Sequence, residues 1–372
     1  MKNKLFSATI FLSFASIILI VIQTFRRAFR PIGNDFTCYL ISASDFIQGK
    51  NPYTTDSAFP YIYPQFFDVL MLPFTFVPYW LAVFLWISIS YFSLFYTIKI
   101  ILRILNPENY SFYNTLVYFS AINLLQFAIL QNNFLNGQVN IILLFLCTLF
   151  LYYHLRKNIF FESLFLAIAI SIKITPAFLL IFLLFHKKIK TILLTSVLAF
   201  LFIFGLPFLL TGFKSIEYYK YYLDTFILHK TMQGDEIIGY SLSSIFSYVT
   251  PKFAVILSAF TMIVVNFLNQ KLSVIESSKI QKTILFSLYL ISILFISPMS
   301  EGHHLILIFP AYIYLLDFII KKPNKILTTI FVIITIVPLV FRKVDLIVFP
   351  TLLLLYFIIS KLNLSISESK NL

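Results

Sequence analysis

The chain begins with the apolar run LFSATIFLSFASIILIVIQT (residues 5–24), and the polar stretch GNDFTCYLISASDFIQGKNPY (residues 33–53) follows soon after it. A run of about 20 predominantly apolar residues is long enough to cross the hydrocarbon core of a bilayer as a helix. Lys2 and Lys4 precede the run and no small-x-small cleavage pattern follows it, so we expect a retained anchor rather than a signal peptide. The two stretches together predict a membrane-crossing helix followed by a polar segment outside the membrane.

The composition is that of a membrane protein. Of the 372 residues, 60% are hydrophobic and only 12% are charged, whereas charged residues make up about 25% of a soluble domain. The net charge of +13 would indicate nucleic-acid binding in a soluble protein. Here the lysines and arginines fall mainly between apolar runs, where they set the orientation of membrane helices. We therefore expect membrane lipids, and no nucleic acid, as partners.

The pattern of apolar runs predicts an all-α bundle of about 12 transmembrane helices in a single domain, residues 1–372. The distribution of basic residues favours a multi-pass plasma-membrane protein with both ends in the cytoplasm. On this topology residues 25–65 form a first outer loop and residues 212–252 a second. Residues 66–78 are bracketed by prolines and too short to cross, so we expect a re-entrant or interfacial piece. Further spans are expected at residues 79–102, 113–131, 138–154, 191–211, 253–270, 283–298, 303–320, 326–341 and 345–361.

Residues 159–185 form an unusual apolar segment. It contains Glu162 near one end and Lys173 in the middle, followed by Pro176, and basic clusters flank it on both sides. If both clusters are cytoplasmic, the segment must rise and return, with each arm about 20 Å long. The alternative is one long tilted helix with a lysine buried at mid-bilayer, which costs roughly 2.5 to 3.5 kcal/mol.

On the expected topology, polar groups from distant parts of the chain gather at one membrane face. They come from the first outer loop, from NGQVN (136–140), from the middle of the 159–185 segment and from SPMSEGHH (297–304). Acid, amide, lysine and histidine side chains at one face are typical of an active site at the boundary between lipid and water. The candidate residues are Asp35, Tyr39, Gln138, Asn140, Lys173, Glu301, His303 and His304.

Asp35 begins a stretch with helical spacing. Tyr39 and Phe46 fall on one stripe and Gly49 marks the end, which predicts a short amphipathic helix on the membrane. Asp45 lies about 80° from Asp35 around this helix, so the two carboxylates do not form a pair. Asp35 is then either a structural N-cap or a general base facing a membrane cleft.

His303 and His304 are adjacent, so their side chains point about 100° apart on a helix and only one is expected to face a common cavity. A histidine at a helix start is often merely interfacial, but two beside Glu301 favour a functional role. The spacing lacks H-E-x-x-H, and Cys38 and Cys147 lie far apart in the sequence. We therefore expect no metal site, no disulfide framework and no cofactor.

Four tyrosines gather in EYYKYYLDTF (217–226), within the second outer loop. Tyrosines at a membrane interface usually serve as anchors. Stacking on an acceptor sugar is the alternative function of these rings.

Five polar or proline-containing stretches recur along the chain: DFTCYLISASDFIQGKNPY (35–53), YIYPQFFDVLMLPFTFVPYWLAVFLW (61–86), NGQVNIILLF (136–145), SIKITPAFLLIFLL (171–184) and SPMSEGHHLILIFPA (297–311). In this order they resemble the polyprenyl-phosphate-sugar-dependent glycosyltransferases of the GT-C superfamily, specifically glycosyltransferase family 87, whose members are largely alpha-mannosyltransferases. Two departures stand out: Gln65 follows Pro64 where the family usually has a second proline, and Asp68 occupies a position that is usually apolar.

This resemblance implies a GT-C-type bundle and a hexosyltransferase whose active site faces the outer side. Asp35 matches the family's catalytic aspartate of the first outer loop, and His303 and His304 occupy the late motif implicated near the donor phosphate or the acceptor. The expected partners are a polyprenyl-phosphate sugar donor and a lipid or glycan acceptor. Lys173 is a candidate cation for the phosphate, and no DxD motif for a nucleotide-sugar metal is present. The alternative function is a glycolipid flippase or transporter, which would show broken helices in corresponding halves of the chain.

Overall fold

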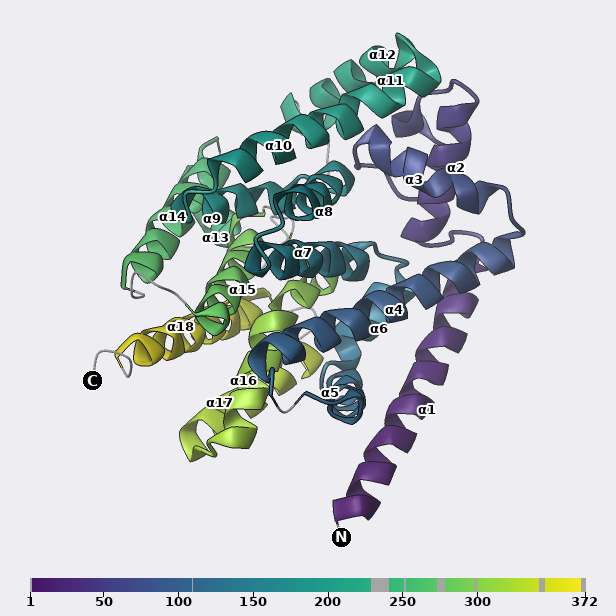
Figure 1. Cartoon of the computed structure of the whole chain (residues 1–372). Helices are drawn as coiled ribbons and strands as arrows, with labels where there is room; N and C mark the ends of the chain where they lie inside the picture. The colour runs from purple at the N-terminus through teal and green to yellow at the C-terminus, as the bar shows by residue number, and fades with distance from the viewer. Residues whose placement is uncertain are drawn as a thin grey trace.

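The computed structural model describes residues 2–108, 110–228, 241–250, 252–272, 278–297, 300–340 and 345–368. These residues form helices and no strands, as expected from the sequence (Figure 1). The α-helices are α1 (Lys2–Ala28), α2 (Asp35–Ile47), α3 (Gln65–Thr75), α4 (Tyr79–Leu105), α5 (Phe112–Leu125), α6 (Phe127–Leu135), α7 (Asn140–Leu155), α8 (Ile159–Ile172), α9 (Leu179–Phe185), α10 (Ile189–Phe200), α11 (Leu206–Thr211), α12 (Lys214–Tyr222), α13 (Leu242–Ser247), α14 (Ala254–Leu272), α15 (Lys279–Ile296), α16 (Phe309–Lys321), α17 (Lys325–Val340) and α18 (Asp345–Glu368).

Six helical segments in the described residues are long and apolar enough to cross a membrane, which makes this a multi-pass membrane protein. The count rises to seven if α5 and α6, which meet at a bend of 79°, are taken as one span. The expected number of about 12 crossings is not confirmed, because several expected spans are bent, broken or short. The six segments are Ser7–Ala28, Tyr79–Leu105, Ile189–Thr211, Ala254–Lys271, Lys279–Ile296 and Gly302–Lys321.

The 159–185 segment breaks at Lys173 and returns. α8 ends at Ile172, and a 3-10 turn with Pro176 near its start separates it from α9. The ring of His154, at the end of α7, lies 5.3 Å from that of His186, which follows α9. The segment therefore comes back to the end of the bundle where it started. The rise and return are confirmed, and the alternative of one long tilted helix is wrong.

The expected amphipathic helix after the first span is α2, which lies beside α3 beneath α11 (Figure 1). Its buried stripe includes Tyr39 and Phe46, as the spacing predicted. Ser42 donates a hydrogen bond of 2.7 Å to the buried Asp68 carboxylate of α3. Residues 66–78 contain this short α3 rather than a crossing helix, so the prediction of a non-spanning piece agrees with the structure.

The tyrosines of α12 face the protein more than the interface. The hydroxyl of Tyr219 donates to the carbonyl of Ile203 at 2.6 Å, and the ring of Tyr222 lies 5.0 Å from that of Tyr53. Tyr221, by contrast, is 39% exposed. Tyr219 and Tyr222 thus fix α12 both to the π-helical turn that contains Ile203 and to the 53–62 segment. Residues 229–240 of the expected second outer loop lie outside the described part of the chain.

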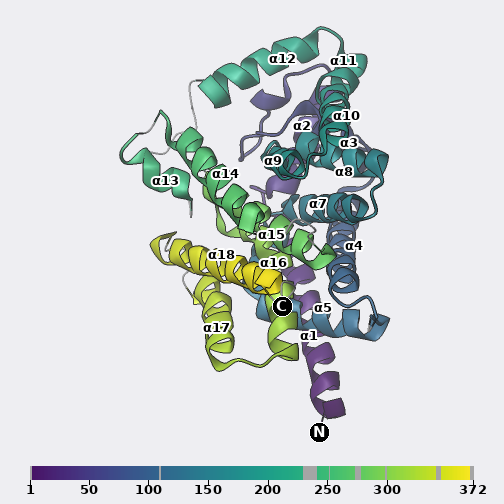
Figure 2. The same cartoon turned by 60° about the vertical axis from the view of Figure 1, so that its left-hand side comes forward.

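α15 lies in the middle of the bundle, with α14 and α18 beside it (Figure 2). It is buried on nearly all sides, as expected for a helix that is apolar around its whole circumference. Its C-terminal end leads into the 297–304 stretch, and its N-terminal end lies near the turn that contains His186. α15 therefore connects the two ends of the bundle.

Candidate active site

Asp35 is held against the 136–140 turn. Its backbone N–H donates to the carbonyl of Asn136 at 3.1 Å, and the side-chain amide of Gln138 donates to its carboxylate. The indole N–H of Trp86 fixes the turn from the other side by donating to the carbonyl of Gly137 at 3.0 Å. Two separate contacts therefore position the carboxylate relative to α7.

The N-cap of α2 is Asn34 and not Asp35. The Asn34 side chain accepts the backbone N–H of Thr37, and its amide donates to the carbonyl of Leu135 at 3.1 Å. Asp35 is the first residue inside the helix, so the interpretation of Asp35 as the N-cap is wrong. Its carboxylate is not used for capping and faces Gln138 instead.

A chain of polar contacts joins Asp35 to the late histidine stretch. Asn140 donates to the side-chain oxygen of Gln138 at 3.3 Å, and the ammonium of Lys173 donates to Asn140 Oδ1 at 3.3 Å. Lys173 Nζ also lies 2.7 Å from His304 Nε2. Residues from four distant parts of the sequence thus converge at one end of α7, as the sequence predicted.

The neighbours of His304 complete this end of the site. The backbone N–H of Glu301 donates to His304 Nδ1 at 3.0 Å, and His303 Nδ1 lies 3.4 Å from the Glu301 carboxylate. His303 is itself buried, and its carbonyl accepts from Asn133 at 2.8 Å. His304 is the histidine within hydrogen-bonding distance of Lys173, but the two rings lie 4.2 Å apart and do not diverge as expected.

The Lys173–His304 pair can carry at most one positive charge. An imidazolium and an ammonium at 2.7 Å would repel strongly in this half-buried place. In addition, a neutral imidazole ring has only one nitrogen that can accept a hydrogen bond. In His304 one ring nitrogen faces the Glu301 N–H and the other faces Lys173, so a neutral ring cannot accept from both. An arriving anion would favour the charged form of this pair.

Tyr39 and Tyr63 form an aromatic wall beside Lys173. The Lys173 ammonium lies 5.9 Å from the centroid of the Tyr63 ring, within the range of a cation–π contact. Tyr39 donates to the Tyr63 hydroxyl at 3.1 Å and packs its ring against it. Tyr39 therefore supports the site through Tyr63. Sequence reasoning missed Tyr63, because nothing in its local pattern separates it from the other tyrosines.

Burial raises the pKa of the Asp35 carboxyl to about 6, and the negative charge of Glu301 adds to this effect. The positive charge of Lys173, the hydrogen bond from Gln138 and the positive charge of Arg27 act in the opposite direction. A carboxylate with a pKa near 6 is largely ionised at neutral pH and yet more basic than an exposed aspartate. Such a group suits general base catalysis.

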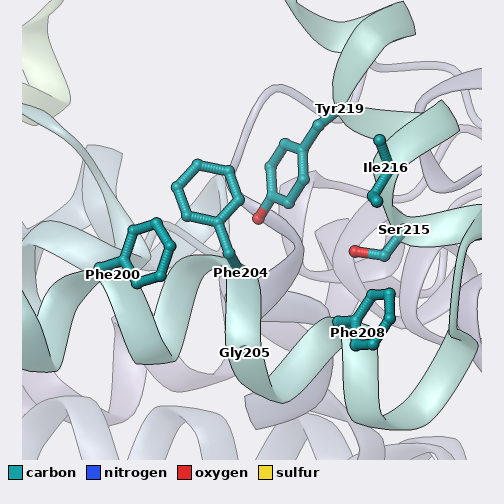
Figure 3. A pocket seen from close by; sticks show the side chains of 7 residues that line it. All are labelled: Phe200, Phe204, Gly205, Phe208, Ser215, Ile216 and Tyr219. Atoms are coloured by element: carbon teal, nitrogen blue, oxygen red, sulfur yellow. The ribbon is translucent and has the colours of Figure 1, made fainter.

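An apolar groove opens between the α10–α11 span and α12 (Figure 3). Its volume is about 400 Å³. The Ile189–Thr211 segment that forms one wall contains a π-helical turn, Leu201–Gly205, and is mostly exposed, as expected for a helix in contact with lipid. The groove is lined by Phe200, Phe204, Gly205, Phe208, Ser215, Ile216 and Tyr219.

Tyr219 connects this groove to the polar site. Its ring lines the groove, and its hydroxyl accepts the backbone N–H of Gln65 at 3.2 Å. Gln65 follows directly on the segment that contains Tyr63, whose ring faces Lys173. The 61–65 segment therefore contacts both the apolar groove, through Gln65, and the polar site, through Tyr63.

Within the described residues, no three His, Cys, Asp or Glu side chains are close enough together to hold a metal ion. Cys38 and Cys147 are both buried and unpaired with each other. The acid, amide and lysine of the site can instead bind hydroxyl groups and an anion directly.

The fold and the site define a multi-pass membrane protein in which the carboxylates of Asp35 and Glu301 and the ammonium of Lys173 lie near one another at one end of the bundle. The family model for glycosyltransferase family 87 matches residues 61–270, more than half of the chain. The chain therefore belongs to glycosyltransferase family 87 and is a membrane glycosyltransferase. No curated protein and no solved structure matches it.

The matched region contains only part of the site. Gln138, Asn140 and Lys173 lie within residues 61–270, whereas Asp35 and His304 lie outside on either side. The structure brings Asp35 into contact with Gln138. It also brings His304 into contact with Lys173. The predicted family is thus confirmed, while the role that the resemblance gives to Asp35 stays a prediction.

The backbone of Gly137 provides a test of how the site is positioned. Gly137 has φ 65°, and a Cβ atom there would lie 2.7 Å from Phe36 Cβ and 2.9 Å from the Phe36 backbone nitrogen. We expect Gly137→Ala to push the turn away from α2 and to lower transferase activity on the order of 100-fold, because small displacements of catalytic groups have large effects.

Gly212→Ala is the matched control for this substitution. Gly212 also has a positive φ, of 59°, but a Cβ atom there would meet nothing within 4 Å. Because a side chain is strained at any positive φ, the control introduces backbone strain without the collision. Equal losses of activity in the two variants, measured in the same membrane preparation, would contradict a specific positioning role for Gly137.

Proposed function

We propose that this protein transfers a hexose, most simply mannose in view of its family, from a polyprenyl-phosphate-linked donor to a hydroxyl group of a lipid or glycan acceptor. The observation that supports this proposal is the arrangement of Asp35 and Lys173 on either side of the Gln138–Asn140 amide pair. One base and one cation, next to an apolar groove, are what such a reaction needs. The site would face the outer side of a plasma membrane.

In the proposed reaction the acceptor hydroxyl attacks the anomeric carbon of the sugar while the Asp35 carboxylate removes its proton. The bond between the anomeric carbon and the phosphate oxygen breaks, and polyprenyl phosphate leaves with the bonding electron pair. Protonated Asp35 then releases its proton to water. Attack opposite to the leaving group inverts the anomeric centre, so that a beta-linked donor gives an alpha-linked product.

The leaving phosphate gains negative charge as the bond breaks, and a cation placed there stabilises the transition state more than the ground state. Lys173 is the candidate for this role, and its ammonium also donates to Asn140 Oδ1. Glycoside hydrolases need a second carboxyl group as general acid. A phosphate leaves without protonation, so a single carboxylate is sufficient and we propose that the reaction requires no metal.

The apolar groove beside α12 supports a lipid-linked donor. Its lining is almost wholly hydrocarbon, and it ends at Tyr219, whose hydroxyl contacts the segment leading to the polar site (Figure 3). We propose that the first isoprene units of the donor lie in this groove while the phosphate reaches Lys173. Burying each CH₂ unit there contributes about 0.8 kcal/mol to binding.

Asp35→Asn tests the general base directly. The substitution keeps the size of the side chain but removes the basic oxygen, and we expect sugar transfer to fall by about 100-fold or more. Purified protein, labelled polyprenyl-phosphate sugars and a mixture of envelope lipids and glycans provide the assay. Asp45→Asn is the control, since Asp45 lies on the same helix but pairs with Lys50 at 3.5 Å.

Full transfer by the Asp35→Asn variant would exclude Asp35 as the base. If the wild-type protein instead moves the intact labelled donor across the membrane of a vesicle without transferring the sugar, the alternative of a flippase or transporter replaces the proposed enzyme.

The pH dependence of the rate gives a second test. Asp35 must be deprotonated to act, so we expect the rate to rise with pH through about 6 and to level off above it. Glu301→Gln removes a charge that raises the pKa of Asp35 and should move this rise to lower pH. Gln138→Met removes a hydrogen bond that lowers the pKa and should move it to higher pH. Shifts in the same direction would contradict this electrostatic account.

Gly205→Leu tests the groove. A Cβ atom at Gly205 would make only ordinary contacts with Leu201, so the helix should accept a side chain that fills the groove. We expect KM for a long-chain polyprenyl donor to rise about tenfold, since lost burial of two CH₂ groups is worth roughly 1.6 kcal/mol. A donor with a single isoprene unit should show little change. An equal rise for both donors would place the polyprenyl chain elsewhere.

A further inference from the structure

Three lysines lie together at the end of the bundle opposite Asp35. Lys157 is in the turn between α7 and α8, Lys188 immediately precedes α10, and Lys282 is in the first turn of α15. α7 starts at the polar site and α8 returns to it, and helices of their length rise about 21 to 24 Å. The lysines are therefore separated from Asp35 by most of the roughly 30 Å thickness of a hydrocarbon core.

These lysines repel one another. The turns that contain Lys157 and Lys188 lie side by side, because the rings of His154 and His186 in these turns are 5.3 Å apart. The charges of both lysines act on the ammonium of Lys282, and Lys188 and Lys282 are half-buried. In the part of the chain that the structure describes, none of the three forms an ion pair. Glu162, in the first turn of α8 after Lys157, pairs with His154 at 2.8 Å, and both side chains are buried. The positive charge of the cluster is thus uncompensated by the described residues.

The helix ends at this site increase the positive potential. The N-termini of helices carry partial positive charge and favour acidic side chains. The first turns of α10 and α15 contain no acidic residue, and lysines occupy both starts: Lys188 and Lys190 at α10, and Lys279 and Lys282 at α15. The two helix N-termini and their lysines therefore create a positive electrostatic potential, which a bound anion would neutralise.

The backbone holds two lysines of this region in a strained conformation. Lys157 has φ 58° and Lys187 has φ 55°, in the left-handed region that glycine usually occupies after a helix. In both turns the N–H of the lysine and that of the next residue bond back to the preceding helix. The left-handed conformation costs a non-glycine residue roughly 1 to 2 kcal/mol. Glycine would remove this strain but also the cation.

We infer that Lys157, Lys188 and Lys282 bind the phosphate of an anionic phospholipid head group in the leaflet opposite to Asp35. A phospholipid fits better than a soluble phosphate because α10 presents apolar side chains directly beside Lys188. Ile189 is 51% and Leu193 is 62% exposed, and both can contact acyl chains below the head group. Basic pockets between membrane helices bind anionic lipids in this way. This inference does not depend on the proposed transferase reaction.

The test is retention of phosphatidylglycerol by the full-length protein. Wild type is reconstituted in nanodiscs of equal phosphatidylglycerol and phosphatidylcholine, and the bound lipids are counted by native mass spectrometry. We expect the triple variant Lys157→Gln, Lys188→Gln, Lys282→Gln to bind phosphatidylglycerol about 100-fold more weakly, since each lysine near a membrane surface contributes about a factor of 5. The triple Lys→Arg variant should retain binding.

The control variant, Arg103→Gln, Lys322→Gln, Lys325→Gln, removes three exposed basic residues from the same end of the bundle and should change binding less than about threefold. Equal weakening in both triple variants would show diffuse attraction and overturn the site. Equal retention of both lipids by the wild-type protein would also overturn the site. This result does not depend on whether any variant folds. Displacement of the lipid by millimolar inorganic phosphate would overturn the lipid assignment in favour of a free anion.

Discussion

The close approach between the start of α2 and the 136–140 turn is the constraint on which the site depends. It requires a residue without a side chain at position 137, because the backbone of Phe36 occupies the space that a Cβ atom would need. Trp86 then holds the turn from α4, and Gln138 presents its amide to Asp35. The Asp35 carboxylate at the start of α2 is in this way fixed to the turn that begins α7.

The remaining polar residues of the site follow from the same geometry. Irregular backbone and charged side chains are tolerated at membrane depth only where protein or water surrounds them. The break at Lys173 meets this condition, because the ammonium contacts Asn140, His304 and the Tyr63 ring. The helix break at Lys173 would be unfavourable if it were exposed to lipid. The residues that surround this break are also those available to a substrate.

The sequence predicted the main features of this arrangement. The first span, α2, the turn at Lys173 and the convergence of Asp35, Gln138 and His304 all follow from apolar length and from the positions of polar residues within apolar runs. The number of crossings did not follow, because hydropathy does not detect that apolar helices such as α7 and α8 are short, or that α5 and α6 meet at a bend of 79° at Gln126. Adjacent residues that are equally good caps, such as Asn34 and Asp35, also cannot be separated without coordinates. Tyr63 is one of 22 tyrosines and carries no distinguishing local pattern.

The two cysteines make the intactness of this arrangement measurable. Cys38 lies on α2 and Cys147 on α7, the two helices that meet at the site, and both are buried. Burial also raises the pKa of the Cys38 thiol to about 12, so the reactive thiolate is scarce as well as inaccessible. A maleimide reagent should therefore label the folded protein slowly and the unfolded protein quickly. Labelling in native membranes would thus distinguish a variant that has lost the packing of α2 and α7 from one that has lost only its activity.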